Sequence, residues 1–106
     1  MTYFAITAVE LDQDGEIVRG KVHRIVGGNQ NVPEFEDRFK ILDRVKLVDL
    51  AGDDEVFALR DSDGQTLPPH RVRIRRSLDA IEHIESVDEK GQVSDALARL
   101  PRLTSG

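Results

Sequence analysis

The chain has 106 residues, no cysteine and a net charge of −5, with 33% charged and 39% hydrophobic residues. This length corresponds to one domain, which can bury roughly 65% of the surface that its unfolded chain exposes. The lack of cysteine excludes disulfides and cysteine-ligated zinc, and the acidic net charge argues against binding nucleic acid or membranes through bulk charge.

The N-terminal segment predicts two strands joined by a tight turn. Thr2 to Glu10 reads as a strand with few polar residues, so we expect it to be covered on both faces. The sequence Asp12-Gln13-Asp14-Gly15 predicts the turn, because Asp and Gly tolerate the positive φ that hairpins need. Glu16 to Val26 is the returning strand, and the polar, glycine-rich residues 27–31 predict a loop.

The segment Pro33 to Ala51 is the best helix candidate, with Gly52 as its C-terminal end. Its apolar residues recur at intervals of three and four, at Phe35, Phe39, Leu42, Val45 and Val48. This spacing predicts that Phe35 and Phe39 belong to the core. Two pieces broken near Leu42-Asp43 fit equally well, with Asp43 capping a shorter helix through Ala51. A pair of strands at 38–41 and 45–50 is the less favoured alternative.

The second half of the chain predicts further strands. Glu55 to Arg60 is a short strand, followed by a turn at 61–64, and Leu67-Pro68-Pro69 excludes regular ladder pairing. Arg71 to Arg75 alternates strictly and predicts a strand. Ile81 to Val87 is favoured as another strand, although a helix capped by Ser77 also fits.

The C-terminal quarter predicts a turn and a short helical turn that would complete a small fold. After a turn at 88–91, Ser94 suits the N-cap of one helical turn, whose Leu97 and Leu100 would pack back on the sheet. We therefore predict a single α+β domain over residues 1–101 and a flexible tail over 102–106. Its expected architecture is a small, mainly antiparallel sheet of four to five strands with one main helix packed on it.

Metal and catalytic signatures are missing from the sequence. The Asp-x-Asp-Gly turns resemble calcium loops, but Lys21 occupies the twelfth position around Gly15 and Leu59 the first position around Gly64. His23, His70 and His83 lack the spacing of paired ligands, and no nucleophile or phosphate-loop motif occurs. We expect no enzyme activity, no metal and no cofactor.

One group of basic residues is a candidate anion or nucleic-acid patch. Alternation places three arginines on one strand face, and two basic residues share a face of the second strand; the patch is Arg19, Lys21, Arg71, Arg73 and Arg75. No aromatic residue lies among them in the sequence to stack bases. The alternative is a solvated face paired with carboxylates on adjacent strands, such as Glu10, Glu82 and Glu85.

Short motifs spread over most of the chain resemble a family of short uncharacterised bacterial proteins that end in an Asp-Asn-Leu-x-x-Leu-Pro-like motif. The matching residues are Ile6-Thr7-Ala8-Val9, the segment 47–52 that ends in Gly52, and Ser94-Asp95-Ala96-Leu97-Ala98-Arg99-Leu100-Pro101. Ala96 stands where the family usually has Asn. The resemblance implies a small α+β fold and no particular activity.

These features favour a non-enzymatic binding or interaction domain, with an unknown protein as its partner. Nucleic-acid or phosphate-ligand binding through the basic strand face is the alternative, and a small enzyme with an acidic cleft is third. No apolar run approaches about 18 residues and the first residues lack a basic n-region. We therefore expect a cytoplasmic protein without membrane contact.

Overall fold

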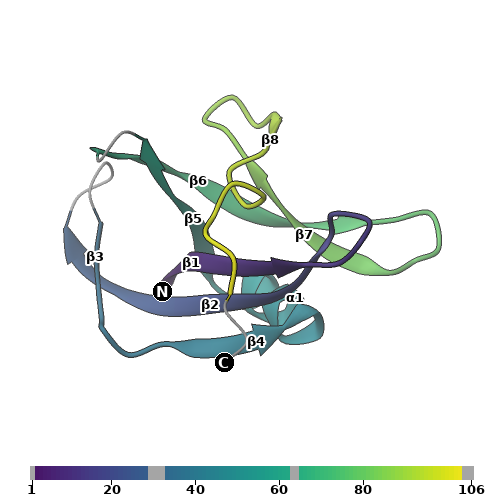
Figure 1. The fold of residues 1–106 in the computed structure, drawn as a ribbon, viewed down its shortest axis with the longest axis horizontal. Helices are drawn as coiled ribbons and strands as arrows, with labels where there is room; N and C mark the ends of the chain where they lie inside the picture. The colour runs from purple at the N-terminus through teal and green to yellow at the C-terminus, as the bar shows by residue number, and fades with distance from the viewer. Residues whose placement is uncertain (1, 29–32, 63–64, 104–106) are drawn as a thin grey trace.

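The protein folds around one strongly curved β-sheet, seen in a computed structural model that describes residues 2–28, 33–62 and 65–103 (Figure 1). The elements in chain order are β1 (Tyr3–Leu11), β2 (Ile17–Gly28), β3 (Pro33–Phe35), β4 (Lys40–Asp43), α1 (Arg44–Asp53), β5 (Glu55–Ser62), β6 (Gln65–Arg76), β7 (Glu82–Val87) and β8 (Val93–Ser94). The strand order is β3-β2-β1-β5-β6-β7-β8, and β4 also pairs with β2.

The predicted α+β class is confirmed, but the predicted number of strands was too low. The five expected strands correspond to β1, β2, β5, β6 and β7. The sheet has eight strands in the described part of the chain, because three further strands of two to four residues, β3, β4 and β8, extend it. Strands this short leave no periodic pattern in a sequence.

β1 is the centre of the sheet, pairing antiparallel with β2 and parallel with β5. Ala5, Ile6 and Val9 are fully buried, which confirms that β1 is covered on both faces. The parallel pairing requires a crossover between the two strands, and the chain makes it through β3, β4 and α1.

The prediction of one helix over 33–51 is wrong, and of the two-piece interpretation the shorter helix capped by Asp43 is confirmed. Asp43 caps α1 by accepting the N–H of Lys46 at 3.0 Å. The residues before it form β3 and β4, whose backbone groups pair with β2 instead of with a helical turn. At the other end, α1 continues through Gly52 to Asp53, so Gly52 does not end it.

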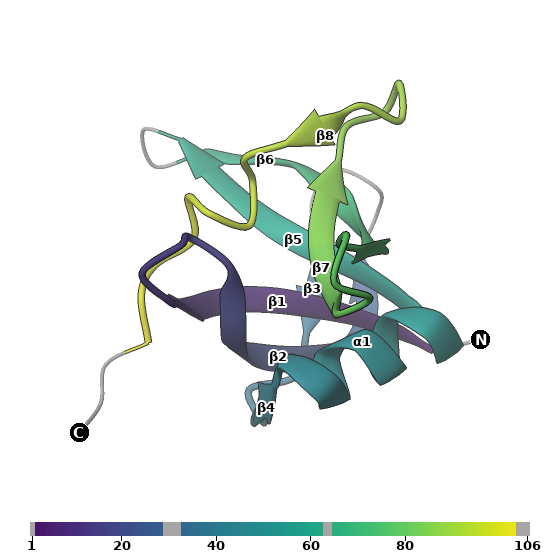
Figure 2. The same cartoon turned by 90° about the vertical axis from the view of Figure 1, so that its right-hand side faces the viewer.

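α1 packs on the inner face of the sheet and completes the core (Figure 2). Leu47 and Val48 are its buried residues. A Cβ added to Gly20 of β2 would lie 3.3 Å from both Leu47 δ-carbons, so the helix sits close against this strand. Within the described residues, no helix has the length and apolar character that crossing a membrane requires.

Polar contacts draw the two sides of the curved sheet together. Glu16, in the β1–β2 turn, lies 2.5 Å from Arg75 of β6 and 3.3 Å from His83 of β7. The hydrogen bond from Arg75 to Glu16 holds the pKa of this guanidinium above its usual value, because it favours the charged form. Arg44 of α1 also donates to the Glu82 carbonyl at 2.6 Å. The sheet is therefore nearly closed on itself.

The C-terminal segment differs from the prediction in two ways. Ser94 belongs to β8 rather than capping a helix, and residues 95–100 form hydrogen-bonded turns whose Leu97 and Leu100 are buried as expected. The tail also does not begin at residue 102. Val9 accepts the N–H of Leu103 and donates to the Pro101 carbonyl, both at 2.9 Å, so this segment is held beside β1.

The proline stretch interrupts the pairing of β5 with β6, as expected. The register shifts between Arg60, opposite Leu67, and Ala58, opposite His70. The strand itself nevertheless continues through Pro68 and Pro69, so β6 is longer than the predicted 71–75.

Three hairpin turns share one geometry. In two of them an aspartate, Asp12 or Asp88, accepts backbone N–H groups two and four residues later, and a glycine, Gly15 or Gly91, has a φ of 81°. The turn from Ser77 to Ile81 has the same backbone hydrogen bonds, but Ala80 takes the glycine position with a φ of 65°. The predicted turn around Gly64 lies outside the described residues.

Exchanging residues at these equivalent positions should change stability in opposite directions. Ala80→Gly should raise the free energy of unfolding by about 0.5–1 kcal/mol, because glycine adopts the left-handed backbone conformation without the steric strain that a Cβ causes. Gly15→Ala should lower it by about 1 kcal/mol, although the added Cβ would have nothing within 4 Å. Urea unfolding measures both, and a loss of stability in Ala80→Gly would contradict the shared geometry.

Stability should also depend on pH through Asp88. Its carboxylate accepts the N–H groups of Gln92 and Lys90, which lowers its pKa below the usual value. The stabilisation is therefore present above the usual aspartate pKa of about 3.9 and is lost as pH falls through the lowered value. The stability difference between the native protein and Asp88→Asn should shrink on acidification. A difference that grows below pH 4 would contradict this sign.

Candidate anion-binding groove

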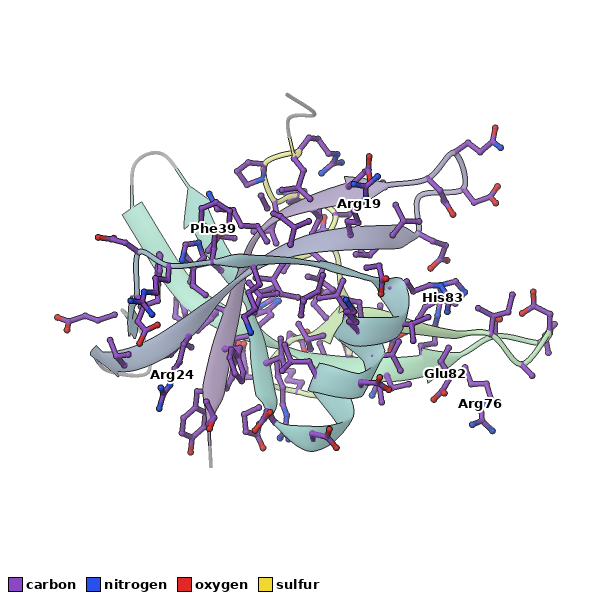
Figure 3. The ribbon with its side chains drawn as sticks, turned by 90° about the horizontal axis from the view of Figure 1, so that it is seen from below. Arg19, Arg24, Phe39, Arg76, Glu82 and His83 are labelled. Carbon is purple, nitrogen blue, oxygen red and sulfur yellow. The ribbon has the colours of Figure 1, made fainter. Side chains whose placement is uncertain are left out.

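The predicted basic patch does not present free positive charge. Its four arginines each lie against a carboxylate: Arg19 with Glu10 at 2.8 Å, Arg71 with Glu55 at 2.8 Å, Arg73 with Glu85 at 2.7 Å and Arg75 with Glu16 at 2.5 Å. Farther along β6, Arg76 lies 3.9 Å from Glu82, at the opposite end of the molecule from Phe39 (Figure 3). Positive and negative side chains therefore alternate on these strands, as in the alternative interpretation of the patch.

Lys21, the fifth residue of the patch, lies elsewhere. It lines a groove of about 830 Å³ whose floor is Thr7 and Ala8 of β1. One wall comes from β2 and β3, and the other comes from β5 and the C-terminal segment, which crosses in front of β1 and β2 in Figure 1. Its polar and aromatic lining residues include Thr7, Lys21, Phe35, Arg60, Arg99 and Arg102.

The groove concentrates positive charge on an acidic protein. Lys21 and three arginines line it, and among the described lining residues Asp95 is the one acid. Asp95 accepts from Arg99 at 2.7 Å. Arg60 and Arg102 each donate one N–H to a backbone carbonyl, of Pro68 and Leu100 respectively. A guanidinium has five N–H donors, so both retain donors for an anion.

Aromatic rings lie beside this positive charge. The His23 ring lies between Phe35 and Phe39, with centroids 4.8 and 5.8 Å away, and its Nδ1 donates to the Glu36 carbonyl at 2.7 Å. The Lys21 ammonium sits 4.2 Å from the centroid of Phe39. Phe39 is 52% exposed, so its expected place in the core was wrong. The assignment of these residues to a helix concealed aromatic side chains next to the predicted patch.

An unpartnered polar atom lies at the floor of the groove. The pairing of β1 with β2 shifts register between Ile6 and Ala8, so Thr7 sits at a bulge. Its Oγ1 is buried and has no hydrogen-bond partner. Such an atom costs about 1–3 kcal/mol of stability.

Catalytic arrangements are not evident in the described residues. His70 and Ser94 approach to 2.7 Å, but the Ser94 hydroxyl donates to Ser86, so His70 donates to Ser94. This direction is the reverse of what a serine nucleophile needs from its base. Among the described residues, no group of three or more His, Asp or Glu side chains could hold a metal.

Neither protein-family models nor curated proteins nor solved structures gave a match for this chain. The resemblance to short uncharacterised bacterial proteins stays a prediction. The function of the groove is therefore inferred from its geometry.

The unpartnered hydroxyl gives a test of the groove floor. Thr7→Val keeps the shape of the side chain and removes the buried hydroxyl, so the free energy of unfolding should rise by about 1 kcal/mol. Thermal and urea unfolding of the ligand-free protein measure the change. A clear loss of stability would mean that Oγ1 is satisfied in the protein itself.

Proposed function

We propose that this protein is a non-enzymatic binding domain that holds an anionic ligand in the groove floored by Thr7 and Ala8. Phosphate or carboxylate groups of the ligand would bind the cations of the walls. The single observation that carries the proposal is the charge of this groove, where Lys21, Arg60, Arg99 and Arg102 face one acid.

The contrast with β6 supports this choice of site. On β6 each patch arginine has a carboxylate within hydrogen-bonding distance, so an incoming anion would have to displace it. In the groove, Arg99 is paired with Asp95, but Arg60 and Arg102 are held by backbone carbonyls, which carry no net charge and orient the guanidinium without neutralising it. Guanidinium groups oriented in this way suit bidentate recognition of phosphate or carboxylate.

The proposed site includes one residue of the predicted basic patch and replaces the other four. Of the predicted patch, Lys21 contributes to the groove, while Arg19, Arg71, Arg73 and Arg75 serve as paired surface residues. The lack of cysteine fits a cytoplasmic place for the protein. An additional protein partner stays a prediction.

Neutralising groove arginines should weaken anion binding selectively. Inorganic tripolyphosphate is the probe, measured by calorimetry at low salt and by amide chemical shifts. Arg99→Gln combined with Arg102→Gln should weaken binding by 10-fold or more (about 1.4 kcal/mol per decade), because two charge-assisted contacts are lost. Shifts on binding should centre on Thr7, Lys21 and Arg60.

The matched control is Arg71→Gln combined with Arg73→Gln, which removes the same charge from β6. It should leave the affinity within about twofold, the small effect expected of exposed ion pairs. Equal losses in the two double variants would show that only net charge matters and would refute the groove as the site. No binding of tripolyphosphate even at low salt would refute the proposed function itself.

A further inference from the structure

The two walls of the groove differ in chemistry. Arg60, Arg99 and Arg102 lie on the side of β5 and the C-terminal segment, whereas Phe35 and Lys21 lie on the side of β2 and β3. Phe39 does not line the groove; its exposed ring lies beyond His23, 5.8 Å from it between centroids, and lines a neighbouring pocket of about 680 Å³. A ligand that fills the groove thus meets guanidinium groups on one side and aromatic faces on the other.

Acidic residues next to the aromatic wall fix the orientation of an anionic ligand. Glu34 lies in β3, and Glu36 and Asp37 lie in the stretch that connects β3 to β4. They would repel phosphate groups from the neighbourhood of Phe35 and Phe39, although Arg38 and Lys40 are also near. Most phosphates should therefore lie along the C-terminal wall and one at Lys21, with the uncharged part of the ligand against the rings.

We propose that the ligand is single-stranded nucleic acid, with a base stacked at Phe39 and its phosphates bound by Arg60, Arg99 and Arg102. This inference rests on the proposed function and names the ligand of the same groove. Phe39 offers an exposed ring, and Lys21 lies over part of it, so the phosphate next to a stacked base would adjoin an ammonium group.

A single strand fits this arrangement better than a duplex does. Aromatic rings beside a basic groove bind unpaired bases by stacking, and every base has a face to offer, so little sequence preference is expected. The bases of a duplex are already stacked on one another and leave only their edges accessible.

The first experiment measures binding of a fluorescein-labelled eight-nucleotide oligothymidylate by fluorescence anisotropy. If all four groove cations contact phosphates, the logarithm of the affinity should fall with the logarithm of salt with a slope of about −2.8. This corresponds to a loss of about 50-fold between 50 and 200 mM salt. Arg99→Gln with Arg102→Gln should reduce the slope to about −1.4.

The second part of the experiment isolates stacking. Phe39→Ala and Phe39→Leu should each weaken oligonucleotide binding, Phe39→Ala by roughly 5- to 100-fold, and should weaken tripolyphosphate binding much less, because only the Lys21 contact adjoins this ring. Leu78→Ala is the matched control, because Leu78 is fully exposed in the turn between β6 and β7. Circular dichroism checks that each variant is folded, and Phe39→Leu provides the test if Phe39→Ala is not.

The outcomes separate this inference from the proposed function. If tripolyphosphate binds and the oligonucleotide does not, or if both Phe39 variants bind it normally, the groove binds anions but not single strands. If thymidine triphosphate binds as tightly as the oligonucleotide, the ligand is a free nucleotide, which also overturns the inference. A duplex that binds as tightly as the single strand would overturn it as well.

Discussion

The close contact between Leu47 of α1 and Gly20 of β2 sets the shape of the sheet. Because β1 and β5 are parallel, the chain must cross from one side of β1 to the other, and α1 is the helical part of that crossover. Any side chain at position 20 would push against the Leu47 δ-carbons. The glycine lets the helix lie deep in the concave face, so the strands on both sides curl around it.

The groove on the opposite face follows from this curvature. A sheet that wraps around α1 and nearly closes leaves room outside β1, where the bulge at Thr7 disturbs the pairing with β2. The C-terminal segment then fills the place beside the end of β1, and it can do so only because Val9 pairs with it there. Arg102 therefore reaches the groove from a segment that was expected to be a flexible tail, and Arg99 from a predicted helical turn that the structure replaces with hydrogen-bonded turns.

Local chemistry in the sequence predicts the long strands and the hairpin turns of this fold. The Asp-x-x-Gly pattern predicts the turns after Asp12 and Asp88, and strict alternation predicts β6, because both depend on neighbours within a few residues. The helix over 33–51 failed because the same apolar spacing serves two short strands paired with β2. That choice depends on an available sheet edge, which no local pattern encodes. The groove was missed for the same reason.

The origin of each basic residue explains why the strand arginines are paired with carboxylates, whereas Arg60 and Arg102 are held by backbone carbonyls. Arg73 and Glu85, like Arg19 and Glu10, are direct cross-strand neighbours, so the register that builds the sheet also pairs their charges. Lys21, Arg60 and the pair Arg99 and Arg102 come from three separate parts of the chain and meet only through the topology. The groove can therefore attract an anion although the protein as a whole is acidic.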